Sequence, residues 1–419
     1  MTISQKILAF HSDKKEVLPG DFIECNVDLI LANDITGPLA IEEFEKIGAK
    51  KVFDPKKIVL VPDHFTPCKD IKSAELVKKL REFSKKYGVR FYEIGRAGIE
   101  HVLLPEEGLT LPGQLIIGAD SHTCTYGAVC SFSTGVGSTD VAYAMITGKL
   151  WFKVPETIKF YYYGRLKEFV GGKDLILYTI GKIGVNGANY KSMEFTGPVI
   201  ENLPMDDRFT MCNMAIEGGA KNGIIKFDRI TENYLKEIDA KFEIKLDLKT
   251  DSENDYEKII EINVDKIDPQ VASPHLPSNS KSVWEYKDVK IDQVVIGSCT
   301  NGRISDLRKT AKILKGKKIH PEVRCIIIPA TQKIYQEALK EGLIEIFLSA
   351  GCVISPPTCG PCLGGHMGVL SKGEVAIATT NRNFIGRMGH PESYVYLSNP
   401  EVAIASAIKG KICHPEEVI

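Results

Sequence analysis

The stretch "IDQVVIGSCTNGRISDLRKTAKIL", residues 291–314, decides the fold class of this chain. It begins with an apolar run that stops at small and polar residues, and it continues with apolar side chains at the spacing of an amphipathic helix. The same alternation continues toward the C-terminus, in "VRCIIIPAT" (323–331), "KIYQEALKEG" (333–342), "GCVISPPTCG" (351–360) and "EVAIATTNRNF" (374–384). Strands that alternate with helices in this way predict an α/β fold.

The N-terminal part of the chain shows the same alternation. Apolar runs that end in polar residues predict strands in "KIVLVPDH" (57–64) and "QLIIGADSH" (114–122). Amphipathic or capped patterns predict helices in "SAELVKKLREFSKKYG" (73–88) and "GVGSTDVAYAMITG" (135–148). The first of these helices is expected to start at Ser73 and to end at Gly88.

The middle of the chain, about 155–285, is richer in charge than the parts on either side of it. It ends in "VASPHLPSNS" (271–280), whose Pro, Ser and Asn residues are typical of a linker. We therefore predict three domains, with the boundaries 1–152, 153–285 and 286–419.

Composition excludes several classes of protein. The chain has 419 residues, of which 43% are hydrophobic, and its 53 basic and 54 acidic residues leave a net charge of −1. Such a balance gives no overall field that would attract nucleic acid or an anionic membrane. No apolar run approaches the roughly 20 residues that span a bilayer, and the N-terminus "MTISQKILAFHSDKKEV" is too polar for a signal peptide. We therefore expect a cytoplasmic protein, in which the eleven cysteines do not form a disulfide framework.

Polar residues with chemical capability recur where the predicted strands end. In open α/β sheets, ligands bind just beyond the carboxyl ends of the strands. Four predicted strand ends of this chain carry such groups, which is more than random surface polarity favours. The groups are Asp63 with His64, Asp120 with Ser121 and His122, Cys299, and Asn381 with Arg382.

Two cysteines stand in the turn "SPPTCGPCLGG" (355–365), and three interpretations of them are open. A redox dithiol is disfavoured, because the glycines that follow Cys362 oppose the long helix that such a site needs. Structural zinc is possible, because Cys359, Cys362 and His366 have a C-x2-C-x3-H spacing and Cys299 could complete four ligands. An iron–sulfur cluster held by the three cysteines is favoured, because it would keep one iron open as a Lewis acid.

Other residues carry groups that suit acid chemistry. Arg382 and Arg387 in "TNRNFIGRMG" (380–389) suit bidentate capture of carboxylates. Glu217 lies among small and apolar residues in "CNMAIEGGAKNG" (212–223) and is either a surface group or a group of the ligand site.

Three histidines have an acidic residue beside or near them. A carboxylate bonded to an imidazole fixes its tautomer and raises its basicity, as the movement of a proton or a hydroxyl requires. The pairs suggested by closeness in the chain are His64 with Asp63, His101 with Glu100, and His122 with Asp120.

Together these motifs resemble the aconitase superfamily. The match follows the family's order along nearly the whole chain, in "NDITGP" (33–38), "DH" (63–64), "GADSHT" (118–123), "NMAIEGGA" (213–220), "GSCTNGR" (297–303), "CGPC" (359–362) and "NRNFIGR" (381–387). The resemblance implies an α/β fold in which three α/β/α-type domains surround a central cluster site, and the activity of a hydro-lyase.

The resemblance also assigns roles to residues. Cys299, Cys359 and Cys362 are expected to hold one [4Fe–4S] cluster per subunit, with one iron not bound by cysteine. The expected catalytic residues are Asp63, His64, His101, Asp120, Ser121, His122 and Glu217. The expected substrate-binding residues are Asn33, Arg382 and Arg387, where Asn33 stands at a position that often carries Gln or His in the family.

The resemblance further implies a partner. Single-chain members of the family end with a mobile swivel domain, and in the split members a separate small subunit provides it. We expect this chain to act only with such a small subunit, in a heterodimer or a heterotetramer, on a small di- or tricarboxylate. The expected substrate is the 2-hydroxy dicarboxylate of leucine biosynthesis, followed by that of a homoaconitase and then that of a citramalate-type isomerase. A cluster sensor that binds RNA without its iron, and a structural zinc protein, are the alternatives of a different class.

Overall fold

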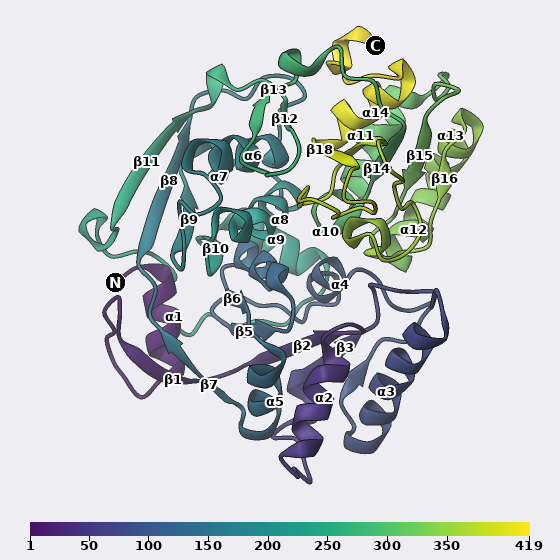
Figure 1. The fold of residues 1–419 in the computed structure, drawn as a ribbon. Helices are drawn as coiled ribbons and strands as arrows, with labels where there is room; N and C mark the ends of the chain where they lie inside the picture. The colour runs from purple at the N-terminus through teal and green to yellow at the C-terminus, as the bar shows by residue number, and fades with distance from the viewer.

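A computed structural model describes all residues, 1–419. Helices and strands alternate along the chain, and the strands form one two-stranded ribbon and three larger sheets. The ribbon pairs β1 (Phe22–Asn26) with β7 (Lys149–Lys153) in antiparallel fashion. Figure 1 shows the N-terminal part of the chain below the middle and C-terminal parts. The α/β fold class predicted from the sequence is confirmed.

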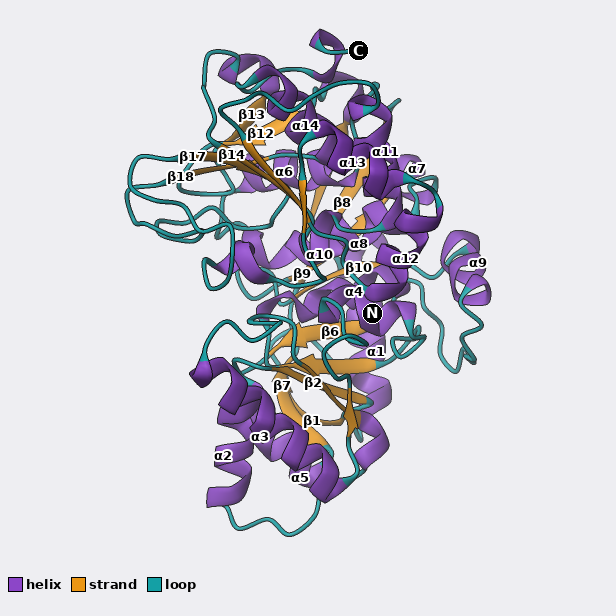
Figure 2. Ribbon diagram, turned by 90° about the vertical axis from the view of Figure 1, so that its right-hand side faces the viewer, coloured by secondary structure: helices purple, strands orange, loops and turns teal.

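The N-terminal sheet has five parallel strands in the order β4-β3-β2-β5-β6. All residues of β2, β3 and β5 are buried, as expected for parallel strands that are covered on both faces. The strands are β2 (Leu29–Asn33), β3 (Ile58–Val61), β4 (Arg90–Phe91), β5 (Leu115–Gly118) and β6 (Phe132–Gly135). The helices of this part are α1 (Ile3–His11), α2 (Gly37–Lys46), α3 (Ile71–Tyr87), α4 (Glu100–Glu106) and α5 (Ser138–Thr147). In Figure 2, α2, α3 and α5 lie together at the end of the molecule that is far from β14 and β17.

Helix α3 shows how local signals set its ends. It starts two residues before the predicted Ser73, because the Asp70 side chain caps it by accepting the Ser73 backbone N–H at 2.7 Å. The Ser73 hydroxyl in turn accepts the N–H of Asp70, which completes a reciprocal capping box. Gly88 ends the helix at a φ of 72°, in the left-handed region that favours glycine.

The middle sheet has four parallel strands in the order β10-β9-β8-β11. Helix α8 packs between this sheet and the short 3₁₀ helix η2 (Ser121–Val129), and thereby joins the middle to the N-terminal part. The strands are β8 (Thr157–Tyr163), β9 (Ser192–Thr196), β10 (Asn222–Ile225) and β11 (Lys258–Asn263). The helices are α6 (Gly172–Ile183), α7 (Pro198–Glu201), α8 (Met205–Asn213) and α9 (Arg229–Glu237), with the 3₁₀ helix η3 (Met214–Gly218).

The C-terminal sheet has seven strands in the order β13-β12-β18-β17-β14-β15-β16, and the last five are parallel. Its strands are β12 (Gln270–Ala272), β13 (Ser280–Ser282), β14 (Gln293–Ile296), β15 (Arg324–Ile327), β16 (Val353–Ile354), β17 (Val375–Ala378) and β18 (Tyr394–Leu397). Its helices are α10 (Ser298–Asn301), α11 (Ile304–Leu314), α12 (Gln332–Lys340), α13 (Leu343–Ala350) and α14 (Pro400–Lys409), with the 3₁₀ helix η7 (Gly360–Leu363).

The segment predicted as a linker, 271–280, belongs to this sheet. It runs from β12 into β13, which pair as an antiparallel hairpin, and Ala272 also pairs with Leu397 of β18. One hydrophobic cluster contains side chains of both the middle and the C-terminal sheet, such as Phe160 and Val295. The middle and C-terminal parts therefore share a core, and the three-domain division of the chain stays a prediction.

The carboxyl ends of strands from two sheets point toward one cavity. The residues that follow β2, β3 and β5 of the N-terminal sheet, and those that follow β14, β16 and β17 of the C-terminal sheet, supply its walls. This arrangement extends the strand-end rule for open α/β sheets to a site shared by two sheets. None of the helices combines the length and the apolar character needed to cross a membrane.

Candidate active site

The cavity between the two sheets has a volume of about 220 Å³. It gathers residues that are far apart in the chain, from Ile35 to Arg387. Of the predicted site residues, those that line it are Asp63, His64, His101, Asp120, His122, Arg382 and Arg387, together with Cys299, Cys359 and Cys362.

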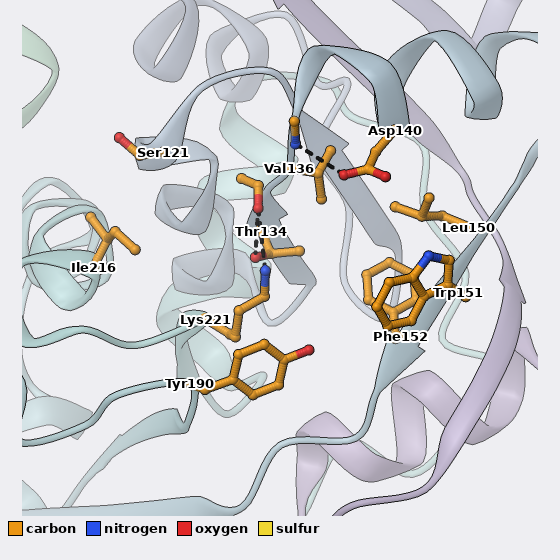
Figure 3. A pocket seen from close by; sticks show the side chains of 12 residues that line it. Ser121, Thr134, Val136, Asp140, Leu150, Trp151, Phe152, Tyr190, Ile216 and Lys221 are labelled. Carbon is orange, nitrogen blue, oxygen red and sulfur yellow. Dashed lines mark hydrogen bonds between the residues drawn. The ribbon is translucent and has the colours of Figure 1, made fainter.

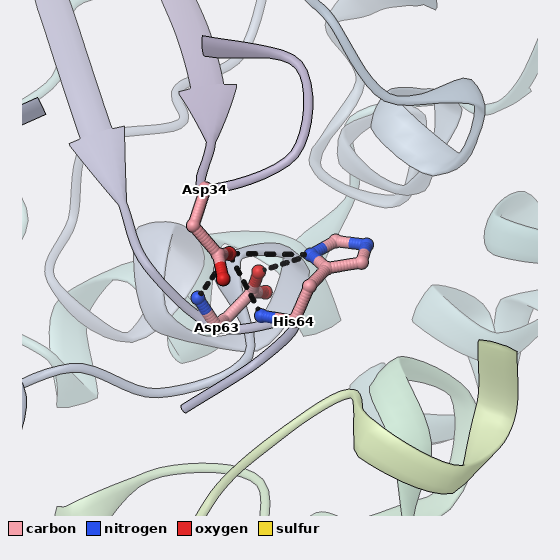
Figure 4. Close-up of side chains that lie close together, drawn as sticks. All are labelled: Asp34, Asp63 and His64. Atoms are coloured by element: carbon pink, nitrogen blue, oxygen red, sulfur yellow. Dashed lines mark hydrogen bonds and ion pairs between the residues drawn. The ribbon is translucent and has the colours of Figure 1, made fainter. Parts of the chain in front are cut away.

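His64 and Asp63 follow β3 and bond to each other. The distance from His64 Nδ1 to Asp63 Oδ1 is 2.5 Å, and both side chains are buried. Asp34, which follows β2, supports this turn because its Oδ1 accepts the backbone N–H groups of Asp63 at 3.0 Å and of His64 at 2.9 Å (Figure 4). The fully buried Asp34 carboxylate thus fixes the backbone that presents the pair.

The other two histidines have shorter contacts with acids that are farther along the chain. His101 Nε2 lies 2.9 Å from Asp120 Oδ1, and His122 Nε2 lies 2.8 Å from Glu217 Oε1. The suggested partners lie slightly farther away, at 3.5 Å for both His101 with Glu100 and His122 with Asp120. Asp120 also accepts the backbone N–H of His122 at 2.8 Å, so it contacts both His101 and His122, while the other ring nitrogen of His122 faces Glu217 of η3.

Burial and pairing act against each other on the pKa values of these groups. Burial alone would lower the pKa of His64, but the charge and hydrogen bond of Asp63 raise it well above its usual value. Burial alone would raise the pKa of Asp120, but hydrogen bonds from His101 and His122 bring it well below its usual value. The pKa of Glu217 is lowered too, because His122 outweighs burial. Pairing therefore favours the protonated form of His64 and the charged forms of Asp120 and Glu217.

Glu100 is a buried acid of the cavity wall whose pKa shifts in the opposite direction to those of Asp120 and Glu217. Burial, reinforced by the charges of Asp63 and Asp120, raises its pKa well above the usual range. Its Oε1 accepts a hydrogen bond from Asn33 Nδ2 at 3.1 Å, whereas its Oε2 has no partner. A neutral carboxyl with a free oxygen can donate a hydrogen bond, which a carboxylate cannot do.

Three predicted site residues do not line the cavity: Asn33, Ser121 and Glu217. Glu217 bonds to two residues that do line it, His122 and Arg382. Asn33 does not line it, because its Oδ1 accepts the backbone N–H groups of Ile35 and Thr36 before α2 while its Nδ2 bonds to Glu100. Ser121 instead lines a neighbouring cavity of about 440 Å³, where Figure 3 shows it on the side opposite Trp151. Neither Asn33 nor Ser121 lines the central cavity, and their roles toward a substrate stay predictions.

The three predicted cysteines line the cavity from loops of the C-terminal sheet. Cys299 stands in α10 directly after β14, and Cys359 and Cys362 lie in the turn that follows β16 and includes η7. Asn213 and Asn381 donate side-chain N–H groups to Cys299 Sγ at 3.2 and 3.3 Å. Burial nevertheless raises the pKa of the Cys299 thiol to about 12, so these donors only partly offset the cost of a thiolate there.

The turn that carries the cysteine pair is tied to the histidine side of the cavity. The backbone N–H of Cys359 and the hydroxyl of Thr358 both donate to the carbonyl oxygen of Asp63, at 2.7 and 3.0 Å. Gly364 ends η7 at a φ of 66°, a conformation that side-chain-bearing residues rarely adopt. The cysteine turn and the first histidine pair are therefore positioned together.

The donor set fits a polynuclear group better than a single metal ion. A tetrahedral zinc ion with ligand bonds of about 2.3 Å brings its sulfur atoms to about 4 Å from one another, but the three Sγ atoms do not form a set within 4.8 Å. The proposed fourth zinc ligand, His366, does not line the cavity. The hydrogen bond from Cys359, with the charges of Arg387 and His122, brings the pKa of Cys362 well below its usual value. These residues fit an iron–sulfur cluster bound through three thiolates.

The two arginines have different surroundings. Arg382 Nε donates to Glu217 Oε1 at 2.7 Å, so that Glu217 receives both Arg382 and His122. Arg387 is mostly buried, its Nη2 lies 4.0 Å from Cys362 Sγ, and its Nε has no partner. A buried guanidinium N–H without a partner at a cavity wall is a donor available to an anionic ligand.

Several residues that position the site were not assigned a role from the sequence. Asp34 holds the backbone of His64, Tyr126 Oη lies 3.0 Å from His101 Nδ1, and Asn213 bonds to Cys299. Asp34 follows a strand directly, so the strand-end rule applied to β2 would have found it. Tyr126 and Asn213 lie in helical segments, where no strand-end signal marks them.

Comparisons with known proteins agree with this geometry. The chain matches the model of the Aconitase family (aconitate hydratase) over residues 5–285 and 278–410. It is 67% identical over 419 residues to the 3-isopropylmalate dehydratase large subunit of Thermodesulfovibrio yellowstonii, covering 100% of this chain and 99% of that protein. It is 64% identical over 421 residues to the protein of the same name from Moorella thermoacetica, again covering 100% and 99%.

A solved structure supports the fold. The crystal structure of Thermococcus kodakaraensis aconitase X in its holo-form aligns with a TM-score of 0.55 and 15% identity. The alignment covers 97% of this chain and 95% of that one.

Proposed function

Because this chain belongs to the aconitase family, we propose that it is the large catalytic subunit of a 3-isopropylmalate dehydratase. As such it is a hydro-lyase that interconverts 2-isopropylmalate and 3-isopropylmalate by removal and re-addition of water, in leucine biosynthesis. The observation that carries the proposal is the meeting of histidine–carboxylate pairs, arginines and cysteine thiols at one cavity. The identity to relatives of that name, across the whole chain, supports the choice of reaction.

Cys299, Cys359 and Cys362 are the residues that would hold a [4Fe–4S] cluster. When bound, such a group supplies a Lewis-acidic iron that lacks a cysteine ligand. The amide donors of Asn213 and Asn381 stabilise the negative charge on the Cys299 sulfur.

The arginines bind and orient the substrate. The free Nε of Arg387, close to the cysteines, is available to a substrate carboxylate. Arg382 is partly engaged by Glu217, so it orients this acid and offers its remaining N–H groups to the cavity. Two guanidiniums on one wall suit a dicarboxylate better than a neutral ligand.

Apolar side chains of the same cavity support an alkyl-substituted substrate. Ile35, Ile99 and Leu363 line it beside the charged groups. A branched alkyl group gains about 0.8 kcal/mol for each buried CH₂ group, whereas a carboxylate in the same place would be desolvated without a partner. This wall therefore favours the isopropyl substrate over one with a further carboxylate.

The histidine pairs move the proton of the departing hydroxyl group. His64 and His101 are each held by a carboxylate, Asp63 and Asp120, and both rings line the cavity. An imidazolium supported in this way can protonate the leaving oxygen and then accept the proton when water adds in the reverse direction. His122 and Glu217 form the third pair and fix Arg382.

We assign the removal of the carbon-bound proton to a small partner subunit. Each histidine of the cavity is already engaged by a carboxylate, which leaves no free neutral base for this step on the chain. The relatives are named large subunits, which supports a heteromeric enzyme. The eleven free cysteines are consistent with a reducing, cytoplasmic location.

Anaerobic co-expression with a candidate small subunit tests the proposal. The complex should be coloured and should contain iron. Its turnover of the two isopropylmalates should be faster than its turnover of homoaconitate or citraconate. Cys299→Ser should abolish turnover, whereas Cys325→Ser, at an equally buried cysteine outside the cavity, should retain most of it. Full turnover by the Cys299 variant would contradict the proposal.

A further inference from the structure

Lys173 is a buried cation behind the cysteine loops. It lies in the first turn of α6, is 1% exposed and does not line the cavity. Its Nζ donates to the carbonyl oxygens of Thr379 at 2.6 Å and Thr380 at 2.7 Å. The Thr300 hydroxyl and the Asn301 side-chain oxygen lie farther away, at 3.4 and 3.3 Å.

No carboxylate forms an ion pair with this ammonium group. The acids that influence it, Asp174 and Asp306, lie beyond ion-pair distance, and Asp174 instead caps α6 and bonds to Asn399. Burial lowers the pKa of Lys173 to about 7, and the largest influences that oppose this shift come from Cys299 and Cys362. Burying an ammonium ion costs several kcal/mol, and neutral carbonyl groups offset only part of that cost.

The groups that Lys173 binds lead directly to the cysteines. Thr379 and Thr380 directly follow β17 and precede Asn381. The Asn381 side chain donates to Cys299 Sγ and accepts from Cys362 Sγ at 3.4 Å. Thr300 follows Cys299 in the chain, and its hydroxyl donates to the Thr379 carbonyl. Lys173 thus ties the loop after β14 to the loop after β17 from the side away from the cavity.

From this arrangement we infer that Lys173 is a positioning residue for the cysteine-held cluster, acting as its buried counter-charge and as the tie between its two supporting loops. The inference rests on the proposed function, because it presupposes a cluster bound by the three thiolates. A cluster held by three thiolates carries a net negative charge. That charge stabilises the ammonium ion, and by reciprocity the ammonium ion stabilises the cluster.

Substitutions at this position separate charge from support. Lys173→Met keeps the length of the side chain without charge, Lys173→Gln keeps one donor without charge, and Lys173→Arg keeps the charge. The control is Lys182→Met on the same helix, where the exposed lysine donates to the Glu261 carbonyl at 3.2 Å.

Each variant is purified anaerobically in complex with the small subunit. Three quantities are measured: the rate of iron release, the reduction potential of the cluster, and the melting temperature with and without the cluster. The neutral variants should release iron at least about tenfold faster, which corresponds to about 1.4 kcal/mol. Their reduction potential should fall, because a positive charge no longer favours the added electron. Their melting temperature should drop more with the cluster than without it, whereas Lys173→Arg and Lys182→Met should match the wild type in potential.

The outcomes distinguish the inference from the proposed function. In one outcome, the neutral variants lose the same amount of melting temperature with and without the cluster, while their reduction potential and iron release stay unchanged. That result would mean that Lys173 only supports the structure, and it would overturn the inference alone. A wild-type complex that binds no iron would overturn the proposed function and the inference together. If Lys173→Met does not fold, Lys173→Gln, which can still bond to one of the two threonine carbonyls, carries the comparison.

Discussion

Replacing Arg387 by lysine should weaken substrate binding without removing the cluster. The free Nε of Arg387 is buried in the cavity wall, and its Nη2 is 4.0 Å from Cys362 Sγ. Lysine keeps the positive charge that faces Cys362 but replaces a rigid fork of donors by a single point of contact. The expected loss is therefore one charge-assisted hydrogen bond to the substrate carboxylate.

The size of this effect follows from the energy of such a bond. A hydrogen bond to a charged group contributes about 1.5–3 kcal/mol, and each 1.4 kcal/mol is about tenfold. We expect kcat/KM of Arg387→Lys to fall about 10- to 100-fold, and that of Arg387→Met to fall further because the carboxylate then has no partner. Since the carboxylate is held in both the ground state and the transition state, most of the change should appear in KM.

The assay is steady-state kinetics of the complex with the small subunit, on both isopropylmalates. Iron and sulfide are counted for each preparation, because the guanidinium also lies near Cys362. A matched control is Arg324→Lys, an arginine of the C-terminal sheet whose side chain pairs with Glu374 far from the cavity. An unchanged KM in Arg387→Lys, or a loss of activity that follows iron content alone, would refute the assignment of Arg387 to substrate binding.

Three further predictions concern other parts of the site and the core. Glu217→Gln should reduce kcat about 100-fold, because a neutral amide no longer pairs with His122 and Arg382. Steady-state kinetics of the complex check this, and a kcat within about twofold of the wild type would contradict it. In Glu100, the folded pKa is raised above the unfolded value, so the folded state binds more protons and the free energy of unfolding decreases as pH rises above about 4.5 toward the folded pKa. Denaturant unfolding of the chain across this range should show that slope, and Glu100→Gln should flatten it; an identical slope in the variant would mean that other groups cause it. Gly127→Ala should destabilise the chain by about 3 kcal/mol, because a Cβ there would lie 1.7 Å from the Gly223 carbonyl oxygen. Thermal unfolding checks this. The control is Gly218→Ala, because a Cβ at Gly218 meets nothing closer than 3.4 Å.

The sequence predicted the walls of the cavity well because strand ends are local signals. An apolar run that stops at Asp63, Asp120 or Cys299 marks both a strand and its carboxyl end, and parallel pairing brings such ends together. The partners of the histidines could not be predicted in the same way. Glu217 reaches His122 from η3, 95 residues farther along the chain, and no local pattern encodes that contact.

Two other differences have local causes. Composition suggested a linker at 271–280, but β12 and β13 have only three residues each, too few to produce a visible strand pattern between Pro, Ser and Asn. Asn33 was expected to touch substrate; in the structure its Oδ1 accepts the backbone N–H groups of Ile35 and Thr36 in the turn before α2, and its role toward a substrate stays a prediction.

The cysteines and two of the histidine–carboxylate pairs belong to different sheets, and this separation has a consequence for how the enzyme responds to strain. Cys299, Cys359 and Cys362 stay at fixed spacing as long as the seven-stranded sheet is intact, and His64 and His101 do so as long as the five-stranded sheet is intact. The hydrogen bonds that Thr358 and Cys359 donate to the Asp63 carbonyl oxygen cross from one set to the other, so a hinge movement that widened the gap between His64 and the cysteines would have to break them. A companion chain that strained these two hydrogen bonds would therefore displace the first histidine pair from the cysteines while both sheets stayed intact.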